Sequence, residues 1–417
     1  MPAIQNPSLP KDKIKVLLLE GISETAVASL TAAGYTNVDR LTTALDGDDL
    51  IAALDGVRMR GIRSRSQVTA EIIDATNSLI AVGCFSVGTN QINLDAARSK
   101  GIPVFNAPFS NTRSVAELTI AEIIMLFRRT FPRSMAAHHG RWEKSASRSN
   151  EIRGKTLGIV GYGNIGSQLA VLAEAMGLRV IYYDHTDKLR HGNVEPMTSL
   201  DELLAVADVV TLHVPQTPET KGMIGPAEIA RMKPGAFLIN NSRGNVVDID
   251  ATAKALESGH LGGVAIDVFP KEPSSNAESF TSPLQGLDNV ILTPHVGGST
   301  AEAQERIGEE VVKKLIEYSD VGSTIGAVNF PQAQLSRGHT GTRFIQVQKN
   351  LPGELGRLND VFAANGVNIA AQFYETAGDI GYVVLDADGA VADADRVLAD
   401  IRALPGTIRA RRLSARP

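Results

Sequence analysis

One segment constrains the fold more than any other: residues 155–184, which read KTLGIVGYGNIGSQLAVLAEAMGLRVIYYD. Gly161-x-Gly163-x-x-Gly166 lies directly after an apolar run and directly before a helical stretch, and a second apolar run ends on Asp184. The glycine pattern alone is weak in a chain with 38 glycines, but its context is specific. A strand, a glycine-rich turn, a helix and a second strand predict a βαβ unit of a parallel sheet.

The glycine-rich turn suits a dinucleotide. Gly161 permits the tight turn, Gly163 lets a pyrophosphate approach the backbone, and Gly166 allows close packing of helix and strand. The free N–H groups at the helix start bind phosphate, and Asp184 can accept hydrogen bonds from a ribose diol. Because a carboxylate repels a 2′-phosphate, the sequence predicts NAD rather than NADP. A glycine-rich turn without a ligand remains the alternative.

Composition excludes several classes of protein. The chain has 417 residues, enough for about two to four domains. Lys and Arg total 41 against 46 Asp and Glu, so no basic surplus points to nucleic acid. Cys84 is the only cysteine, which excludes an intramolecular disulfide and a multi-cysteine metal site, and we expect no metal. Without a secretory h-region or an apolar run of membrane-spanning length, we expect a cytoplasmic protein that contacts no membrane.

Strand and helix signals alternate through the first 330 residues. One series runs over 14–105 and a second over 156–294, separated by a long helix (115–127) and a polar stretch (141–155). Such alternation predicts parallel sheets with helices on both faces. The fold class we predict is therefore α/β, with two doubly wound, Rossmann-like domains.

The last part of the chain has a different pattern. Residues 320–342 are rich in Gly, Ser and Pro, which predicts a linker. The residues after it alternate in the order strand, helix, strand, strand, helix, strand, with expected bounds of 343–348, 352–365, 367–374, 381–386, 392–404 and 407–413. This βαββαβ order is the ferredoxin-like plan.

Three polar residues follow predicted strands of the second series. Arg243, Glu272 and His295 each come after an apolar run. Ligands of open α/β sheets bind outside the carboxyl ends of the strands, so all three point to the cofactor's side. Alone, the histidine fits a structural role and the arginine a loop ion pair.

Together the three residues suit oxidation of a hydroxy acid. When a hydride leaves C2, the hydroxyl proton must leave too, and a histidine with a pKa near 7 is a fitting base. A carboxylate beside the histidine fixes its tautomer and stabilises the imidazolium. An arginine binds the substrate carboxylate and polarises the C2 oxygen.

These motifs resemble the D-isomer-specific 2-hydroxyacid dehydrogenase family over nearly the whole chain. The resemblance lies in GYGNIG (161–166), SLDELLAVADVVTLHVPQTPET (199–220), MKPGAFLINNSRGNVVD (232–248), AIDVFPKEP (265–273) and TPHVGGST (293–300). GCFSVGTNQINLD (83–95) and NAPFSNTRSVAEL (106–118) are more particular to members that act on 3-phosphoglycerate. The resemblance implies NAD-dependent oxidation of (2R)-3-phosphoglycerate to 3-phosphohydroxypyruvate, the first step of L-serine biosynthesis, with reduction of 2-oxoglutarate as a further activity.

The resemblance also implies roles and domain limits. Arg243 would bind substrate, His295 would be the acid/base and Glu272 its carboxylate partner, with Asp267 at the nicotinamide carboxamide. Residues 1–110 and 299–335 would form a substrate domain, 111–298 the NAD domain and 336–417 a regulatory domain. The implied cofactor contacts are Gly161, Gly163, Asn164, Ile165, Gly166, Asp184, Asn241, Ser242, Arg243, Asp267, His295, Val296, Gly297 and Gly298.

An arginine-rich stretch, RMRGIRSRSQ, is a candidate phosphate site. Arg63 and Arg65 would share one face of a strand end, and a phosphate suits an arginine cluster. A solvated basic loop is the alternative. The resemblance implies substrate contacts from Arg63, Ser64, Asn111, Arg243 and His295. It leaves open whether Arg60, Arg65 or Lys144 takes part.

The C-terminal unit resembles an ACT domain through NLPGELGRLNDVFAANGVNIAAQ (350–372). In serine-inhibited relatives, residues matching Asn350 and Asn368 hold serine, but Gln348 stands here where those relatives have a histidine. We expect serine feedback in weakened or altered form and a homotetramer; a dimerisation module without a ligand is the alternative. Three other functions stay open for the chain: a glyoxylate or hydroxypyruvate reductase, a non-catalytic NAD-sensing corepressor and an amino-acid-binding regulator.

Overall fold

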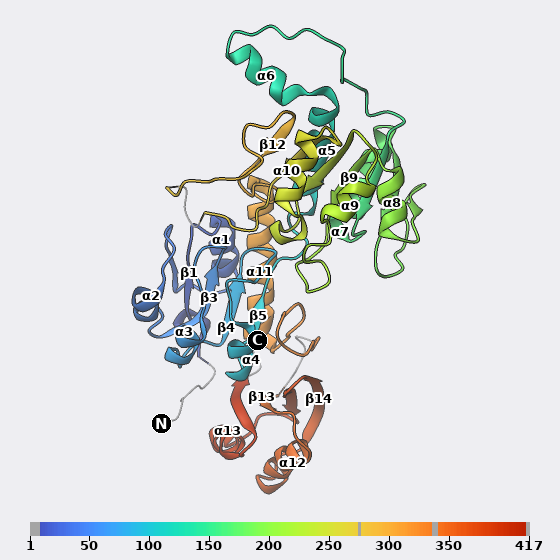
Figure 1. Cartoon of the computed structure of the whole chain (residues 1–417). Coiled ribbons are helices and arrows are strands. Elements are labelled where there is room, and N and C mark those ends of the chain that lie inside the picture. The colour runs from blue at the N-terminus through green and yellow to red at the C-terminus, as the bar shows by residue number, and fades with distance from the viewer. Residues whose placement is uncertain (1–8, 274–276, 336–340, 414–417) are drawn as a thin grey trace. The chain divides into compact units, whose positions relative to one another are not determined.

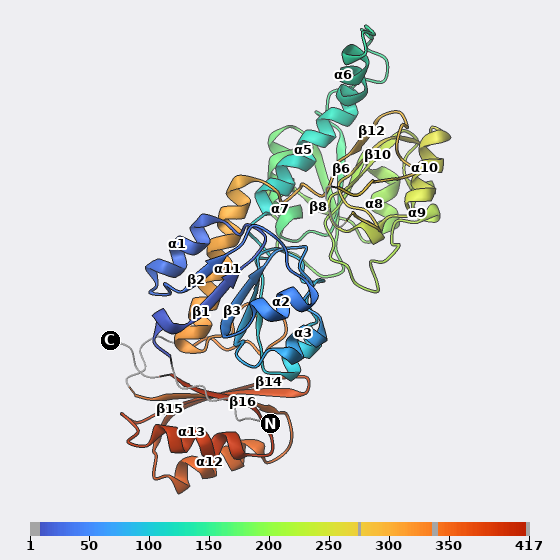
Figure 2. The same cartoon turned by 90° about the vertical axis from the view of Figure 1, so that its left-hand side faces the viewer.

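The computed structural model describes residues 9–273, 277–335 and 341–413. The chain forms two compact units, drawn in Figure 1 and, turned by 90°, in Figure 2. Unit 1 contains the described residues up to Ser110 and those from Gln304 onward, and unit 2 contains Asn111–Ala303. Each unit is described by itself.

Unit 1 contains a parallel sheet with helices on both faces. Its strands lie in the order β2-β1-β3-β4-β5, and Figure 2 shows α1 and α11 on one side of the sheet and α2 and α3 on the other. The strands are β1 (Lys15–Leu18), β2 (Val38–Arg40), β3 (Val57–Ile62), β4 (Ala81–Cys84) and β5 (Val104–Phe105). The helices are α1 (Glu24–Ala32), α2 (Gly47–Ala53), α3 (Ala70–Ala75), α4 (Leu94–Ser99) and α11 (Ala301–Val321), which crosses from unit 2 into unit 1, with a 3-10 turn η1 (Lys11–Lys13).

The continuous apolar run at β1 follows from this two-sided covering. Leu18 packs in a cluster with Val311 of α11, whereas Leu17 packs in another cluster with Leu50 of α2. Because successive side chains of a strand point to opposite faces, a strand covered on both faces needs apolar residues at every position.

Unit 2 contains a second parallel sheet. The strand order is β12-β11-β10-β9-β6-β7-β8, so the chain order reverses between β6 and β9, which is where ligands of such sheets bind. The strands are β6 (Thr156–Val160), β7 (Arg179–Tyr183), β8 (Glu195–Pro196), β9 (Val209–Leu212), β10 (Ala236–Asn240), β11 (Leu261–Ile266) and β12 (Val290–Leu292). The helices are α5 (Thr112–Arg128), α6 (Thr130–His138), α7 (Asn164–Ala175), α8 (Leu200–Val206), α9 (Pro226–Arg231) and α10 (Ile249–Glu257), with η2 (Gly244–Val246).

A third sheet completes unit 1 and is antiparallel, in the order β14-β15-β13-β16. One face packs on its own helices, as where Phe344 meets Phe362, and the other joins the apolar cluster of α11 through Val347 and Tyr382. Arg343 forms a bidentate ion pair with Asp386, at 2.6 and 2.7 Å. The elements are β13 (Arg343–Lys349), α12 (Glu354–Ala364), β14 (Ile369–Ala377), β15 (Ile380–Ala387), α13 (Ala394–Ala403) and β16 (Thr407–Leu413).

The predicted fold class is confirmed: two parallel α/β sheets are followed by a βαββαβ unit. The predicted linker, 320–342, begins later than expected, because α11 ends at Val321. Residues 322–335 have no helix or strand, yet Phe330 is buried, and the Asn329 side chain holds the backbone of Val104 and Ile102. Residues 336–340 of that linker lie outside the described residues. The three predicted domain limits stay predictions.

Two local details differ from sequence expectation. Ser114-x-x-Glu117 has the spacing of a capping box, but α5 begins at Thr112 and the Ser114 hydroxyl bonds to Thr300 instead. A second helix, α6, lies between the predicted long helix and the polar stretch, and the sequence pattern did not predict it. Within the described part of the chain, no helix combines the length and apolarity needed to cross a bilayer.

Candidate active site

The glycine-rich turn in unit 2 has the backbone that its sequence predicts. Gly161 follows β6 with a φ of +93°, and a Cβ there would lie 2.5 Å from the carbonyl oxygen of His213. A Cβ on Gly166 would lie 2.3 Å from the Gly161 oxygen, so α7 meets the turn too closely for any side chain. Beside Gly163 there is open space, as a pyrophosphate would need.

Asp184 lies directly after β7, where the cofactor's ribose was expected. One carboxylate oxygen accepts the backbone N–H of Tyr162 at 2.9 Å, and the other accepts the N–H and hydroxyl of Thr186, both at 3.1 Å. The side chain therefore also braces the glycine-rich turn. The spare acceptor positions of its two oxygens are what a ribose diol would use.

Arg243 is held by the turn that follows β10. Asn240, which sequence analysis did not select, accepts the N–H and hydroxyl of Ser242 and donates its amide to the Arg243 carbonyl at 3.0 Å. The guanidinium of Arg243 donates to the Ser242 carbonyl at 2.7 Å. No other hydrogen bond of this guanidinium occurs among the described residues, so most of its donors remain for an anionic ligand.

His295 and Glu272 form the pair that the sequence predicts. The Nδ1 atom of His295 lies 2.8 Å from a Glu272 carboxylate oxygen, and the other oxygen accepts the N–H of Phe269 at 3.0 Å. A proton on Nδ1 that bonds to the carboxylate leaves Nε2 as the proton acceptor. His295 also has a φ of +53°, an uncommon conformation for a non-glycine residue that often marks a functional position.

The electrostatics of this pair favour the charged forms. The hydrogen bond to Glu272 raises the pKa of His295 despite partial burial of the ring. Burial raises the pKa of Glu272, but the hydrogen bonds from His295 and Phe269 outweigh it and lower the pKa below its ordinary value. Burial lowers the pKa of Arg243, which Glu272 partly offsets, so all three residues interact electrostatically.

The loop after His295 is closed over Asp267. This carboxylate is 1% exposed and accepts the Thr293 hydroxyl at 2.6 Å and the N–H groups of Val296 and Gly297 at 2.8 Å each. A nicotinamide carboxamide would reach Asp267 only if this loop shifts. A Cβ on Gly298 would lie 2.7 Å from the amide nitrogen of Asn111, so Asn111 borders the same loop.

Glu122 of α5 is a second residue that sequence analysis missed. Its carboxyl group is fully buried and accepts the Asn241 amide at 2.6 Å, while Thr119 accepts the same amide at 3.0 Å. Burial, together with the nearby negative charge of Asp267, raises the pKa of Glu122 to about 8, although the hydrogen bond from Asn241 opposes the shift. Its position in the apolar run at 118–127 was the available signal.

The candidate phosphate residues lie in unit 1, on the loop after β3. Arg63 is half-buried and Arg65 and Ser64 are exposed, whereas Arg60 is fully buried. None of the Arg60 guanidinium nitrogens has a hydrogen-bond partner among the described residues. Arg60 therefore cannot contact a substrate from the surface, and Lys144 lies on an exposed loop of unit 2.

The candidate effector residues differ in exposure. Asn350 and Asn368 are exposed and bond to the Gly378 carbonyl and the Asp388 carboxylate at 3.0 and 3.4 Å. Gln348 is fully buried, and both polar atoms of its side chain have no partner among the described residues. Unpaired buried amides are costly, so a water molecule or a ligand group is expected to satisfy this one.

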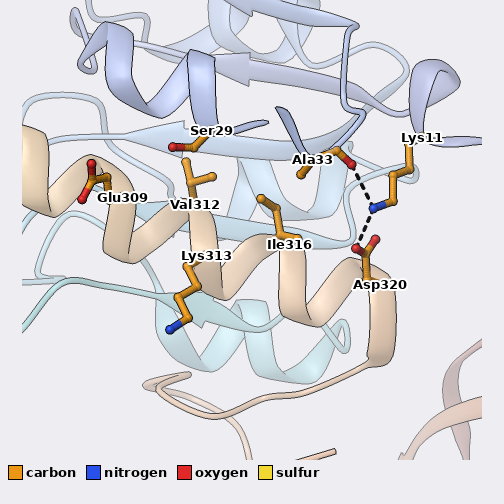
Figure 3. Close-up of a pocket in the computed structure, with 8 residues that line it drawn as sticks. All are labelled: Lys11, Ser29, Ala33, Glu309, Val312, Lys313, Ile316 and Asp320. Carbon is orange, nitrogen blue, oxygen red and sulfur yellow. Dashed lines mark hydrogen bonds and ion pairs between the residues drawn. The ribbon is translucent and has the colours of Figure 1, made fainter. Parts of the chain in front are cut away.

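A cavity of about 430 Å³ lies in unit 1 beside α1 and α11, away from every predicted residue (Figure 3). Lys11 lies at one end of it, beside Ala33 and Asp320, donating to the Ala33 carbonyl at 2.9 Å and to Asp320 at 2.6 Å. The described residues contain no cluster of His, Cys, Asp and Glu suited to a metal.

Family models match two parts of the chain. The NAD binding domain of the D-isomer specific 2-hydroxyacid dehydrogenases matches residues 120–297, which contain the glycine-rich turn, Arg243, Glu272 and His295. An AHAS small subunit-like ACT domain matches residues 345–409.

Known proteins match over longer stretches. The chain is 54% identical to D-3-phosphoglycerate dehydrogenase of Escherichia coli (strain K12) over 406 residues, which cover 97% of this chain and 99% of the relative. The enzyme of that name from Haemophilus influenzae is also 54% identical, over 97% of this chain and 98% of its own. A solved D-lactate dehydrogenase from Aquifex aeolicus, complexed with NAD and lactic acid, is 31% identical with a TM-score of 0.63, covering 73% of this chain and 95% of that one. The chain belongs to the D-3-phosphoglycerate dehydrogenases, which here combine the D-isomer specific 2-hydroxyacid dehydrogenase fold with a C-terminal ACT domain.

Proposed function

We propose that this chain oxidises (2R)-3-phosphoglycerate to 3-phosphohydroxypyruvate with NAD, the first step of L-serine biosynthesis. The observation that carries the proposal is the 2.8 Å contact between His295 and Glu272 in the same unit as the glycine-rich turn. The 54% identity to relatives named for this activity supports the choice of substrate. A cytoplasmic location is part of the proposal.

The residues present fit a bound NAD. There is open space beside Gly163, and a Cβ atom at Gly161 or Gly166 would collide with backbone oxygens. The turn therefore needs glycines, and a pyrophosphate can approach its backbone closely. NAD, when bound, accepts the hydride that leaves C2 of the substrate.

The chain's own side chains handle the proton and the carboxylate. Nε2 of His295 takes the C2 hydroxyl proton while Glu272 stabilises the imidazolium through Nδ1. Arg243, with most of its donors unused by the described residues, binds the substrate carboxylate and polarises the C2 oxygen. In the reverse direction the imidazolium returns the proton, and the same groups suit 2-oxoglutarate as a second keto acid.

The first test follows NADH absorbance while the purified chain meets NAD and 3-phosphoglycerate, with phosphohydroxypyruvate, hydroxypyruvate and 2-oxoglutarate in reverse. We expect the phosphorylated keto acid to react faster than hydroxypyruvate. Equal rates would reassign the chain to a general 2-hydroxyacid reductase. His295→Asn is expected to abolish turnover and keep NADH binding. If the chain were a non-catalytic corepressor, the same substitution would leave its function intact.

Phosphate selectivity is assigned to Arg63, with Ser64 beside it and Asn111 near the substrate carboxylate. A guanidinium fork matches a phosphate in charge and geometry. Arg63→Ala should raise the KM for 3-phosphoglycerate by at least about tenfold, the loss expected for one charge-assisted contact. An unchanged KM would remove Arg63 from the site.

Serine is proposed as the effector of the ACT unit, bound near Gln348, Asn350 and Asn368 at a contact between two copies in a homotetramer. Gln348 binds a carboxylate without a charge of its own, so inhibition should be weaker than with a histidine at that position. Equilibrium dialysis without serine binding at millimolar concentration would refute the effector, and light scattering that reports a monomer would refute the assembly.

A further inference from the structure

The loop that carries the candidate phosphate residues is bound to a single carboxylate, that of Glu20. One Glu20 oxygen accepts the backbone N–H groups of Arg63 at 3.1 Å and Ser66 at 3.0 Å. The other accepts those of Ser64 at 3.1 Å and Arg65 at 2.9 Å. Four consecutive N–H donors therefore point at one anion that belongs to the chain itself.

Glu20 is built into this position rather than resting on the surface. It follows β1, is 3% exposed, and has a φ of +61°, which is an uncommon conformation for a residue with a side chain. Its backbone N–H bonds to Thr43 at 3.0 Å, and its own carbonyl accepts an Arg63 guanidinium nitrogen at 3.4 Å. Such a conformation persists only where surrounding contacts determine it.

The charge of Glu20 is compensated inside the unit. Burial alone raises the pKa of Glu20, but the N–H groups of the loop outweigh it and lower the pKa below its ordinary value. The buried Arg60 also interacts electrostatically with Glu20 and Asp46, and its pKa, lowered by burial to about 10, keeps it protonated at neutral pH. An ionised carboxylate and a buried cation thus lie beneath the same loop.

A second carboxylate extends this arrangement by one residue. Asp46 accepts the N–H of Gln67 at 2.9 Å, so five successive N–H groups, 63–67, end on carboxylates. Gln91 holds the loop from its other side by donating to the Arg63 carbonyl. The backbone N–H groups of the loop are therefore already hydrogen-bonded within the chain, and only the loop's side chains remain to bind a ligand.

We propose that Glu20 is a positioning residue for substrate phosphate: its carboxylate occupies the backbone anion site of loop 63–66 and thereby fixes Arg63 and Ser64 for phosphate recognition by side chains alone. A row of backbone N–H groups is itself an anion site, which without Glu20 would bind phosphate nonspecifically or lose its shape. The inference rests on the proposed function, because it requires that Arg63 contacts the phosphate.

The decisive variant is Glu20→Gly. Glycine accepts the positive φ without strain and leaves a hole where the carboxylate was. We expect the selectivity for phosphohydroxypyruvate over hydroxypyruvate, as a ratio of kcat/KM, to fall by about tenfold to a hundredfold, the range for small misplacements of binding groups. Formate, a free carboxylate, should enter the hole and restore part of the selectivity.

Glu20→Gln is the matched control. The amide fills the same space but presents an N–H₂ group to N–H donors, so selectivity should fall and formate should not restore it. Three results would each overturn the proposal. The selectivity could stay unchanged in both variants, kcat/KM could fall equally for the two keto acids, or formate could fail to restore the selectivity that Glu20→Gly loses. If Glu20→Gly does not fold, the selectivity of folded Glu20→Gln decides.

Arg63→Ala separates this inference from the proposed function. If Arg63→Ala keeps the phosphate selectivity, the phosphate site is misassigned and the role of Glu20 falls with it. If Arg63→Ala loses selectivity while both Glu20 variants keep it, the proposed function stands and only the positioning role is refuted. NADH binding, which belongs to unit 2, should be the same in all three variants, and turnover of hydroxypyruvate reports that they are folded.

Discussion

Glu122 offers a quantitative test of the site, because its carboxyl group is buried with few partners. It accepts one amide hydrogen bond from Asn241, and its other oxygen has no partner among the described residues. Burial raises its pKa to about 8, so at neutral pH the folded chain keeps this carboxyl protonated. Glu122→Gln replaces it with a neutral group of nearly the same shape that still accepts the Asn241 amide.

The expected gain in stability depends on pH. Glu122 has an ordinary pKa of 4.5 when unfolded and about 8 when folded. Below 4.5 both states are protonated and the carboxyl costs nothing. Between 4.5 and 8 only the unfolded chain ionises, so the free energy of unfolding falls by about 1.4 kcal/mol per pH unit. At pH 7 this cost is about 3 kcal/mol, and above pH 8 it is constant at about 5 kcal/mol.

Thermal unfolding of Glu122→Gln and the parent at pH 5, 7 and 8.5 measures this cost. At pH 7 the variant should melt roughly 5 to 10 °C higher for a unit of this size, and the gain should shrink toward pH 5. Glu117→Gln on the same helix is the control, because Glu117 is exposed and should show no such trend. A melting difference that is the same at all three pH values would refute the reasoning, since it would mean that Glu122 does not stay protonated in the folded chain.

Three further substitutions test other parts of the structure. Gly166→Ala places a methyl group 2.3 Å from a backbone oxygen of the turn and should weaken NADH binding by at least about tenfold in a fluorescence titration; unchanged affinity would contradict the tight turn. Glu272→Gln removes the main cause of the raised pKa of His295, so the pH profile of oxidation should move to lower pH. Keto-acid reduction, which needs the protonated imidazole, should lose its rate at neutral pH before oxidation does. An unshifted profile would exclude the pair as acid/base. Asp386→Ala removes the carboxylate partner of the buried Arg343 and should destabilise unit 1 by about 3 to 5 kcal/mol in denaturant unfolding, whereas a loss under 1 kcal/mol would count against the pair.

The βαβ unit and its turn were predictable because their signals are local. The glycines, the apolar runs and Asp184 all fall within 30 residues, and each has a backbone requirement that the residue type reveals. The strand ends that carry Arg243 and His295 were predictable for the same reason. The packing of residues 322–335 was not, because Asn329 finds its partners on a strand more than 200 residues earlier.

The phosphate stretch shows where residue type alone misleads. Arg60, Arg63 and Arg65 look equivalent as letters, yet β3 ends at Ile62 and turns the first into the interior and the others into a loop. The difference depends on burial against α2 and α3, which sequence periodicity does not specify for a strand covered on both faces. Only the structure removes Arg60 from the set of surface phosphate contacts.

Two glutamates interrupt apolar runs in the sequence, and the structure gives them opposite charge states. Glu20 meets four N–H donors, which outweigh the cost of burial and lower its pKa. Glu122 meets one amide and a nearby carboxylate, so burial dominates and its pKa rises. Because the number of donors decides the sign, a glutamate in an apolar run signals a buried carboxyl group but not its charge. The ionised Glu20 suits a loop whose backbone must be held rigid. The neutral Glu122 suits a position behind Asn241, because a second negative charge beside Asp267 would destabilise the cofactor side of the site.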